Sequence, residues 1–297
     1  MKKNRLRREE KRLSILFLAP AIFLIAGVTL VPILYAVRTS FYDTNYTEVQ
    51  EFAGLKHYID ILSSGEGLQA ILNSITYVLL SLLIVIPLGI ILAVMLNRKM
   101  RGRTVLRTII IIPWVLSQTV TALLWQWLLN SSYGPVNYLS VLLTGGKFDV
   151  FNSPIPAKAV VILANVWNSF PIVLILILAA LQSISSEVYE AAQVDGATGI
   201  QSFFYITLPL IRPTILTAIV LQSMEYFNMV TLVYTLTSGG PFGATRTLSV
   251  LAFQEGFDYW HMGYGSAASV LILILNVFFS MAYMGILNRK GDKSEKG

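Results

Sequence analysis

The stretch EAAQVDGATGIQSFFYITLP, residues 190–209, separates two long apolar runs of the chain. Just before it the chain reads SISSEVY, in which Ser185 or Ser186 suits the N-cap of a helix. Glutamates follow within the first turns, where the positive end of the helix dipole favours negative charge. Gly196 is suited to end this helix in the left-handed conformation. The pattern therefore predicts a short helix that runs to about Asp195.

A second short helix is expected directly after this glycine. Thr198 and Gln201 match a capping box, in which each side chain accepts a hydrogen bond from the other residue's backbone N–H group. Leu208-Pro209 is expected to end the helix, because a residue before proline disfavours the helical region. Pro213 then fits the first turn of the next apolar run.

The predicted helix pair is too short to span a bilayer or to build a core of its own. Ala191 and Ala192 keep the first helix slim, which would permit the close approach of another protein's surface. The alternative is an ordinary amphipathic connection at the membrane interface. The local pattern leaves both interpretations open.

The composition of the whole chain is that of a membrane protein. Hydrophobic residues make up 55% of it and charged residues only 13%, about half the share that is usual in soluble domains. Backbone groups in lipid must be satisfied within the segment, so long apolar runs predict helices. We therefore expect an all-α, polytopic protein with six transmembrane helices. The expected spans are residues 13–37, 71–96, 109–129, 159–181, 214–236 and 266–287.

The distribution of cations predicts the orientation of these spans. Seven Lys or Arg lie in residues 1–12, five in 97–107 and four in 288–297, and Arg212 falls on the same side. The opposite side holds five: Arg38, Lys56, Lys147, Lys158 and Arg246. By the positive-inside rule, both termini and the 190–209 stretch are expected in the cytoplasm. Topology also accounts for the net charge of +6, so nucleic acid is not expected as a partner.

The sequence carries none of the motifs that would indicate an enzyme. Cysteine is absent, which excludes thiol nucleophiles and thiolate metal sites. No phosphate-binding loop or G-x-S-x-G elbow occurs, so an energy source would have to come from another chain. His57 and His261 stand alone in expected outer loops, without the spacing of a zinc site. We predict that the chain itself binds no metal or cofactor.

Polar side chains inside spans are costly and often functional. Amides and a carboxylate can bond sugar hydroxyls, and aromatic rings can cover the apolar face of a pyranose. Glu225 is the only acidic residue in any expected span. The alternative is that such groups hold neighbouring helices together, which we favour for Gln118 and Asn276. The candidate lining of a solute path is Asn165, Trp167, Asn168, Gln222, Glu225, Tyr226 and Asn228.

The opening stretch also carries a family resemblance. Its residue order resembles the EAA loop of ABC importer permeases, the membrane subunits of binding-protein-dependent uptake systems. The matching residues are Glu190, Ala191, Ala192, Asp195, Gly196, Ala197, Gln201, Phe203, Ile206, Leu208, Pro209 and Pro213. The segments TLTSGGPFGATRTL (235–248) and QEGFDYWHMGYGSAAS (254–269) resemble the carbohydrate-uptake branch, which includes maltose and glycerol-phosphate permeases.

This resemblance implies a type I ABC importer permease fold, with residues 1–297 as one transmembrane domain. Residues 186–209 would be the coupling loop that docks in a cleft of an ATPase subunit. The implied partners are a second homologous permease, two ATPase subunits that bind ATP and Mg²⁺, and an extracytoplasmic solute-binding protein. The solute would be a saccharide or related polyol, imported across a bacterial cell membrane. The alternative is a self-sufficient secondary transporter or channel, although the two halves show no convincing internal repeat.

Overall fold

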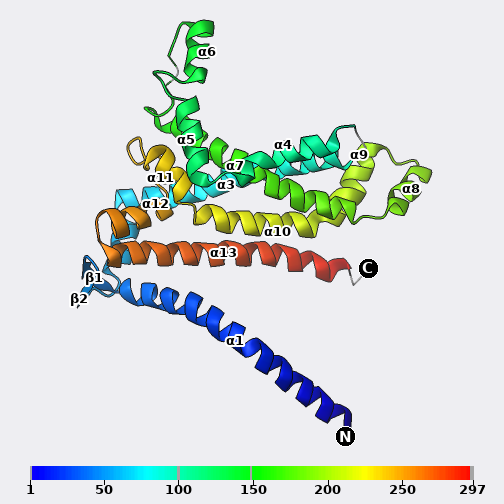
Figure 1. Ribbon diagram of the computed structural model, residues 1–297, viewed down its shortest axis with the longest axis horizontal. Helices are drawn as coiled ribbons and strands as arrows, with labels where there is room; N and C mark the ends of the chain where they lie inside the picture. The colour runs from blue at the N-terminus through cyan, green and yellow to red at the C-terminus, as the bar shows by residue number, and fades with distance from the viewer. Residues whose placement is uncertain (1, 99–100, 148, 295–297) are drawn as a thin grey trace.

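The computed structural model describes residues 2–98, 101–147 and 149–294, which are mainly helical (Figure 1). Five helices are long and apolar enough to cross a membrane, and a sharply bent pair makes a sixth span if it is counted as one. The helices and strands are α1 (Lys2–Thr39), β1 (Tyr42–Asn45), β2 (Glu48–Phe52), α2 (Lys56–Ser63), α3 (Gly65–Asn97), α4 (Arg103–Val115), α5 (Gln118–Leu128), α6 (Pro135–Thr144), α7 (Pro154–Gln182), α8 (Ser186–Val194), α9 (Gly199–Ser202), η1 (Phe203–Thr207), α10 (Leu208–Phe227), α11 (Thr231–Thr237), α12 (Leu248–Phe253), η2 (Gln254–Asp258) and α13 (Met262–Ser294).

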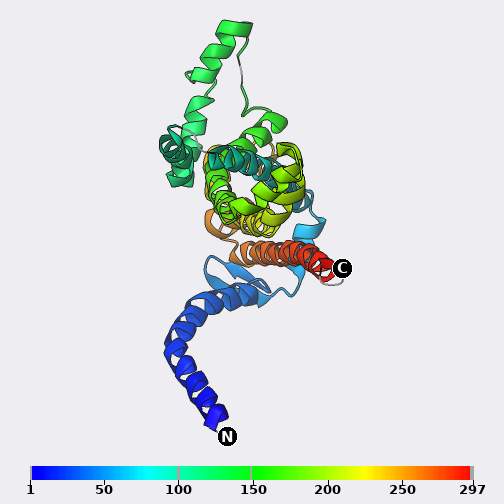
Figure 2. The same ribbon diagram turned by 90° about the vertical axis from the view of Figure 1, so that its right-hand side faces the viewer.

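The core of the bundle is the packing of α3 against α7, with α10 and α13 alongside (Figure 2). Gly89 of α3 lies so close to α7 that a Cβ atom there would be 2.6 Å from a methyl group of Val173. Small residues allow this close approach of helix backbones, which is a main source of helix association in membranes. The α3–α7 pair therefore forms the rigid centre on which the other elements are arranged.

Helix α1 stands apart from this centre. Among the described residues it packs mainly on α13 and β1, and the apolar side chains from residue 17 to residue 35 are largely exposed (Figures 1 and 2). The N-terminal end of α1, the C-terminal end of α13 and the short helices α8 and α9 lie toward the same end of the molecule (Figure 1). Among the basic residues counted for topology, Lys99 and Lys296 lie outside the described residues.

The third expected span, residues 109–129, is not a straight helix. It is divided between α4 and α5, which meet at an angle of 96°. The break has a capping signal of its own, because the Ser117 side chain accepts a hydrogen bond from Val120 N at 3.2 Å. Asn168 of α7 holds the bend, since its amide donates to Pro113 O at 2.8 Å and to Leu116 O at 3.4 Å. Hydropathy alone could not reveal a bend that a neighbouring helix stabilises.

The fifth expected span, residues 214–236, is wrong at both ends. Helix α10 ends at Phe227, Asn228 caps it, and α11 begins only at Thr231. At the other end, Pro209 does not stop the preceding helix. Helices α9, η1 and α10 run on without a break from Gly199 to Phe227.

A π-helical segment explains why the chain continues through proline. Pro209 has no N–H group, and its ring disturbs the carbonyl one turn earlier. In η1 the backbone widens, so that Leu208 N bonds Phe203 O five residues back. Because α10 starts at Leu208, Pro209 occupies its first turn and Pro213 lies inside the helix rather than in its first turn.

Among the described residues a small antiparallel hairpin, β1–β2, forms a two-stranded sheet. Tyr42 pairs with Phe52, and Asn45 pairs with Glu48 across a two-residue turn. The Thr44 hydroxyl accepts a hydrogen bond from Gly263 N at 3.0 Å, which joins the hairpin to the start of α13. The hairpin lies at the end of the bundle opposite α8 (Figure 1).

Candidate functional site

The 190–209 stretch forms two helices joined by a compact turn. The Ser185 side chain caps α8 by accepting from Glu187 N at 3.2 Å. At the other end Gly196 has a φ of 78°, and Ala197 N bonds back to Ala192 O at 2.9 Å. This pair of features is a Schellman motif, which satisfies the last carbonyl groups of a helix. The local prediction for α8 is therefore confirmed.

The start of the second helix is confirmed as well. Gln201 N donates to the Thr198 hydroxyl, and Thr198 N donates to Gln201 Oε1 at 2.8 Å. This reciprocal pair is the predicted capping box. It fixes the direction in which the chain leaves the turn toward α10.

Apolar side chains cover the outside of this helix pair. Val194 is 87% exposed and Ile200 is 73% exposed, although both lie beside the turn. Phe204 and Tyr205 are also more than half exposed. The chain thus presents a group of large apolar side chains at the end of the molecule that it does not itself cover. An exposed apolar group of this kind is suited to contact another protein or the lipid.

One part of the expected contact face is wrong. We expected Ala191 and Ala192 to form one small face toward a partner. Ala191 is exposed, but Ala192 is buried against its own chain, with 7% of its surface accessible. The alanine at 192 lets the Schellman turn fold back on α8, so a large side chain there would disrupt the loop itself.

The helix pair is joined to the bundle by few direct bonds. The Tyr189 hydroxyl lies 3.1 Å from the Thr207 hydroxyl, which links α8 to η1. Between the loop and the ends of α3 and α7 lies a cavity of about 440 Å³, whose polar lining includes Asn97, Gln193 and Ser202. This cavity separates α8 from the ends of α3 and α7, while α9 continues into α10.

The candidate path residues divide into a buried set and an exposed set. Asn165 is completely buried, and Asn168 is occupied in holding the α4–α5 bend, where it also donates to Thr121 Oγ1 at 3.1 Å. Tyr226 bonds Ser169 of α7 at 2.6 Å, and Gln222 donates to the same tyrosine at 3.4 Å. Asn168 and Tyr226 therefore connect neighbouring helices, whereas Gln222 bonds within its own helix. The amide of Asn276, for which we favoured a role between helices, donates to Ile272 O of its own helix at 3.0 Å.

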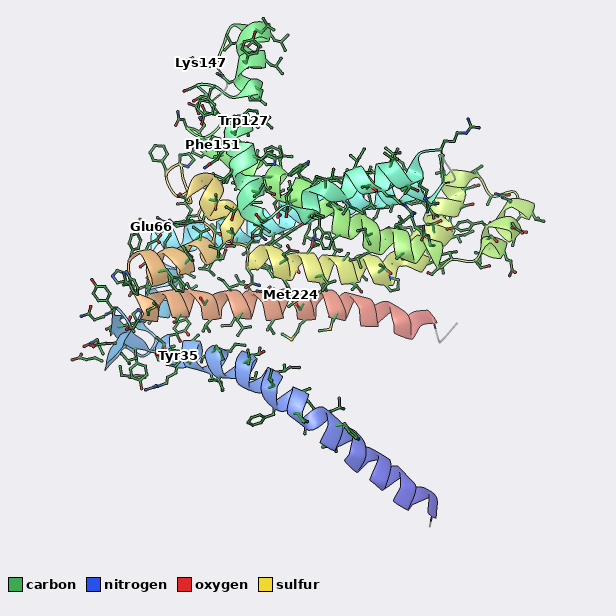
Figure 3. All side chains as sticks on the ribbon, in the orientation of Figure 1. Tyr35, Glu66, Trp127, Lys147, Phe151 and Met224 are labelled. Atoms are coloured by element: carbon green, nitrogen blue, oxygen red, sulfur yellow. The ribbon has the colours of Figure 1, made fainter. Side chains whose placement is uncertain are left out.

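Glu225, Asn228 and Trp167 are the candidate path residues that remain accessible. Glu225 on α10 and Asn228 at its C-cap are exposed, whereas Gln222 is buried, so these three candidates do not share one accessible face. Asn228 lines a cavity of about 220 Å³ together with Ser249, Phe253 and Ser269. Met224 of α10 is exposed as well (Figure 3). Trp167 is half-buried and stacks edge-on with Trp125, their ring centres 6.4 Å apart.

A larger cavity opens near α5 and α11, toward the end opposite α8. Its volume is about 500 Å³, and Phe151 forms part of its wall (Figure 3). Gln126, Asn130, Tyr133 and Ser238 contribute amide and hydroxyl groups. Sequence analysis missed this site, because its residues come from three separate segments and carry no common motif. An array of amides, hydroxyls and rings suits a polyhydroxylated solute.

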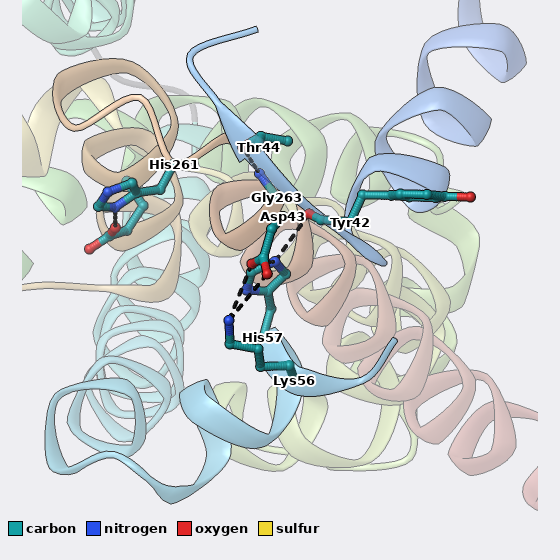
Figure 4. A network of polar contacts seen from close by, with 8 residues as sticks. Tyr42, Asp43, Thr44, Lys56, His57, His261 and Gly263 are labelled. Atoms are coloured by element: carbon teal, nitrogen blue, oxygen red, sulfur yellow. Dashed lines mark hydrogen bonds and ion pairs between the residues drawn. The ribbon is translucent and has the colours of Figure 1, made fainter. Parts of the chain in front are cut away.

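The sequence had indicated that His57 and His261 stand alone, but in the structure both have polar partners. Buried His57 lies 3.1 Å from Tyr42 O and 3.4 Å from Asp43, which also pairs with Lys56 (Figure 4). His261 bonds Glu255 at 2.8 Å. Within the described residues no group of three or more His, Cys, Asp or Glu side chains could hold a metal ion. The His57 and Lys56 contacts attach the hairpin to α2, and the His261 contact attaches the segment just before α13 to η2.

Comparison with known proteins agrees with this architecture. The chain is 31% identical over 284 residues to the trehalose/maltose transport system permease protein MalF of Thermococcus litoralis, covering 95% of this chain and 96% of that protein. It is 31% identical to the sulfoquinovosyl glycerol transport system permease protein SmoG of Agrobacterium fabrum, covering 95% and 92%.

A solved structure has the same fold. A chain of a bacterial alginate ABC transporter, in complex with its alginate pentasaccharide-bound periplasmic protein, superposes with a TM-score of 0.83. The two chains are 26% identical, and the match covers 96% of this chain and 98% of that one. Residues 85–292 match the family model described as the inner membrane component of binding-protein-dependent transport systems. The chain therefore belongs to the family of inner membrane components of binding-protein-dependent transport systems.

Proposed function

We propose that this chain is a pore-forming permease subunit of an ATP-driven importer for a saccharide or related polyol. Its membership of the transport family carries the proposal. The relatives' names place them in systems for trehalose, maltose and sulfoquinovosyl glycerol, and the solved transporter imports alginate. This pattern supports a solute rich in hydroxyl groups. It also weighs against the self-sufficient carrier, because the relatives are permease proteins of larger transport systems.

The proposed assembly contains four further subunits of three kinds. A second homologous permease would complete the pore, and an extracytoplasmic binding protein would deliver the solute. Two ATPase subunits, which would hold ATP and Mg²⁺, would each dock against a coupling loop. The exposed apolar group formed by Val194, Ile200, Phe204 and Tyr205 supports such a docking surface. The location is the bacterial inner membrane, and we propose that both termini are cytoplasmic.

The continuous helix from Gly199 to Phe227 suggests how movement is passed inward from the loop. An ATPase that closes on α8 would displace α9, and η1 would transmit the displacement to α10. Glu225 lies 18 residues beyond Thr207, or about 27 Å along a helix. The solute-facing side of α10 would therefore move together with the loop. For transport, nucleotide and solute must favour different states of the bundle.

The deciding experiment is uptake of radiolabelled trehalose and maltose by cells that express the chain together with the subunits that co-purify with it. The matched comparison is a loop variant, Val194→Asp with Ile200→Asp, which changes only the coupling loop and the first turn of the Gly199–Phe227 helix. We expect uptake that requires ATP and is lost in the loop variant. Uptake driven by an ion gradient in the absence of ATP would contradict the proposal.

A further inference from the structure

A groove between α4 and α7 combines aliphatic walls with two arginines. Its volume is about 330 Å³, and its apolar lining is Ile111, Leu174, Ile175, Leu178 and Ala179. Arg107 and Gln182 close it at the end where α4 begins and α7 ends. The groove thus has a hydrocarbon part and a cationic mouth, and it lies on helices that cross the membrane.

The two arginines of this mouth lack the partners that such charges need. Arg103 and Arg107 are four residues apart on α4, so they face the same side and repel each other. Both guanidinium groups converge on the Gln182 side-chain amide. With the amide turned so that its oxygen faces them, this oxygen accepts from Arg103 at 2.7 Å and from Arg107 at 2.9 Å. That oxygen is neutral and cannot compensate two positive charges.

Further observations point to a missing anion. The Nε atoms of Arg103 and Arg107 are buried, and neither has a hydrogen-bond partner among the described residues. No described carboxylate forms an ion pair with either arginine. Arg103 is also the first residue of α4, where the positive end of the helix dipole disfavours a cation. A phosphate group would supply acceptors for both guanidinium groups and neutralise the charge.

We propose that this groove binds one anionic phospholipid, with its phosphate on Arg103 and Arg107 and one acyl chain between α4 and α7. A lipid is the occupant because it alone joins an anionic group to a hydrocarbon chain at a membrane surface. Basic pockets between transmembrane helices are known to take anionic head groups. The mouth lies near α9 at the end of the molecule that carries the coupling loop (Figure 1).

The bound lipid would brace the end of α7, from which the chain enters α8. Gln182 is the last residue of α7, and α8 begins at Ser186. A phosphate that holds Gln182 and both arginines together would fix this end of α7 against α4. The inference does not depend on the transported solute, because it concerns the chain's own packing in the membrane.

The test measures lipid retained by the full-length chain, purified with its co-purifying subunits in mild detergent. Native mass spectrometry compares phosphatidylglycerol with phosphatidylcholine as added lipids. We expect retention of one phosphatidylglycerol to exceed that of phosphatidylcholine by at least fivefold. Arg103→Gln and Arg107→Gln should each reduce retention about fivefold, since one cation near an anionic lipid contributes roughly 1 kcal/mol.

Three variants make the test specific. Arg101→Gln removes an exposed cation that does not line the groove, and it should leave retention unchanged. Ala179→Trp fills the groove from an exposed position without altering any charge, and it should lower retention as much as an arginine variant. Arg107→Lys keeps the charge and should keep most of the binding, which excludes misfolding as the cause of loss.

Several outcomes would overturn the proposal. Equal retention of the two lipids would show that the groove does not select charge. An equal loss in Arg101→Gln would indicate general surface attraction, and full retention in Ala179→Trp would place the lipid elsewhere. If inorganic phosphate alone displaced phosphatidylglycerol completely, the site would belong to a soluble anion.

Discussion

The two ends of this molecule differ in how their side chains are paired. At the hairpin end polar groups are bonded within the chain, whereas at the α8 end apolar side chains stay exposed and bonds to the bundle are few. At the hairpin end, the loop that follows α11 is bonded internally and to the bundle. Asn73 donates to Gly243 O at 3.0 Å and to Arg246 O at 2.9 Å, and Arg246 pairs with Glu66. At the α8 end, one side-chain pair, Tyr189 with Thr207, joins α8 to η1 across a hollow.

The difference indicates which end is complete by itself. Buried polar groups at the hairpin end are largely paired within the chain, so this end has a defined shape before any partner binds. At the α8 end, apolar side chains lie exposed beside a turn that is held mainly by its own caps. An end with uncovered apolar surface and few anchoring bonds is suited to take its position from another protein.

The largest expected effect comes from filling space at the hairpin end. A Cβ atom at Gly263 would overlap Tyr42 O and lie 2.9 Å from His57 Nε2, where the hairpin meets α13. We therefore expect Gly263→Ala to cost about 3 kcal/mol of stability, the upper part of the range for overpacked sites. Thermal unfolding in detergent measures this loss of stability.

The matched control is Gly285→Ala on the same helix, where a Cβ atom would meet nothing within 4 Å. That change should be neutral or slightly stabilising, because alanine favours a helix over glycine. Equal unfolding temperatures for the two variants would show that the hairpin is not docked as described.

The second expected effect concerns the coupling loop. Val194→Asp with Ile200→Asp should lower co-purification of an ATPase subunit at least tenfold, because charge replaces exposed apolar contact surface. The unfolding temperature should not change, since both side chains point away from their own chain. Ile155→Asp, at an equally exposed apolar position at the start of α7, should retain the ATPase. Loss in the control as well would assign the effect to general surface charge.

The third expected effect separates exposed from buried polar groups on α10. Glu225→Ala and Asn228→Ala should lower solute uptake severalfold while the complex still assembles. Gln222→Ala should instead lower stability by about 1–2 kcal/mol, because it removes a buried bond to Tyr226. Uptake and unfolding temperature are measured for all three variants. Normal uptake in both Glu225→Ala and Asn228→Ala would contradict a solute path on this side of α10.

Sequence reasoning succeeded where structure depends on neighbours along the chain. The Schellman turn at Gly196 and the capping box at Thr198 need only residues within one or two turns. Hydropathy likewise located the expected spans 71–96, 159–181 and 266–287, which lie inside α3, α7 and α13. The family resemblance rested on the same local stretch.

Sequence reasoning failed where contacts between segments far apart in the chain determine the structure. Asn168 is occupied by the α4–α5 bend, some fifty residues earlier in the chain, and Ala192 is covered by the turn that follows it. The cavity beside α5 and α11 has no sequence signal, because its walls meet only after folding. Helical periodicity assigns residues to a face, but it does not say which face another helix covers.

The smallest expected effect is Gly196→Ala, and it tests the loop rather than the bundle. A Cβ atom at Gly196 would meet nothing within 4 Å, so the cost arises only from its φ of 78°. A left-handed conformation costs a residue with a Cβ roughly 1 kcal/mol. Within the loop this strain should weaken the bond from Ala197 N to Ala192 O. The unfolding temperature should stay within error, because the loop has few bonds to the core.

Hydrogen exchange at the amides of Gly196 and Ala197 measures this local cost. We expect exchange there to be about fivefold faster than in the natural sequence, which corresponds to roughly 1 kcal/mol. Gly199→Ala is the control, because it also meets open space but lies three residues away without a positive φ. Unchanged exchange in Gly196→Ala would mean that partner contacts, not the Schellman turn, hold the loop. The α8 end would then take its shape only in the assembled complex, whereas the hairpin end is held by bonds within the chain.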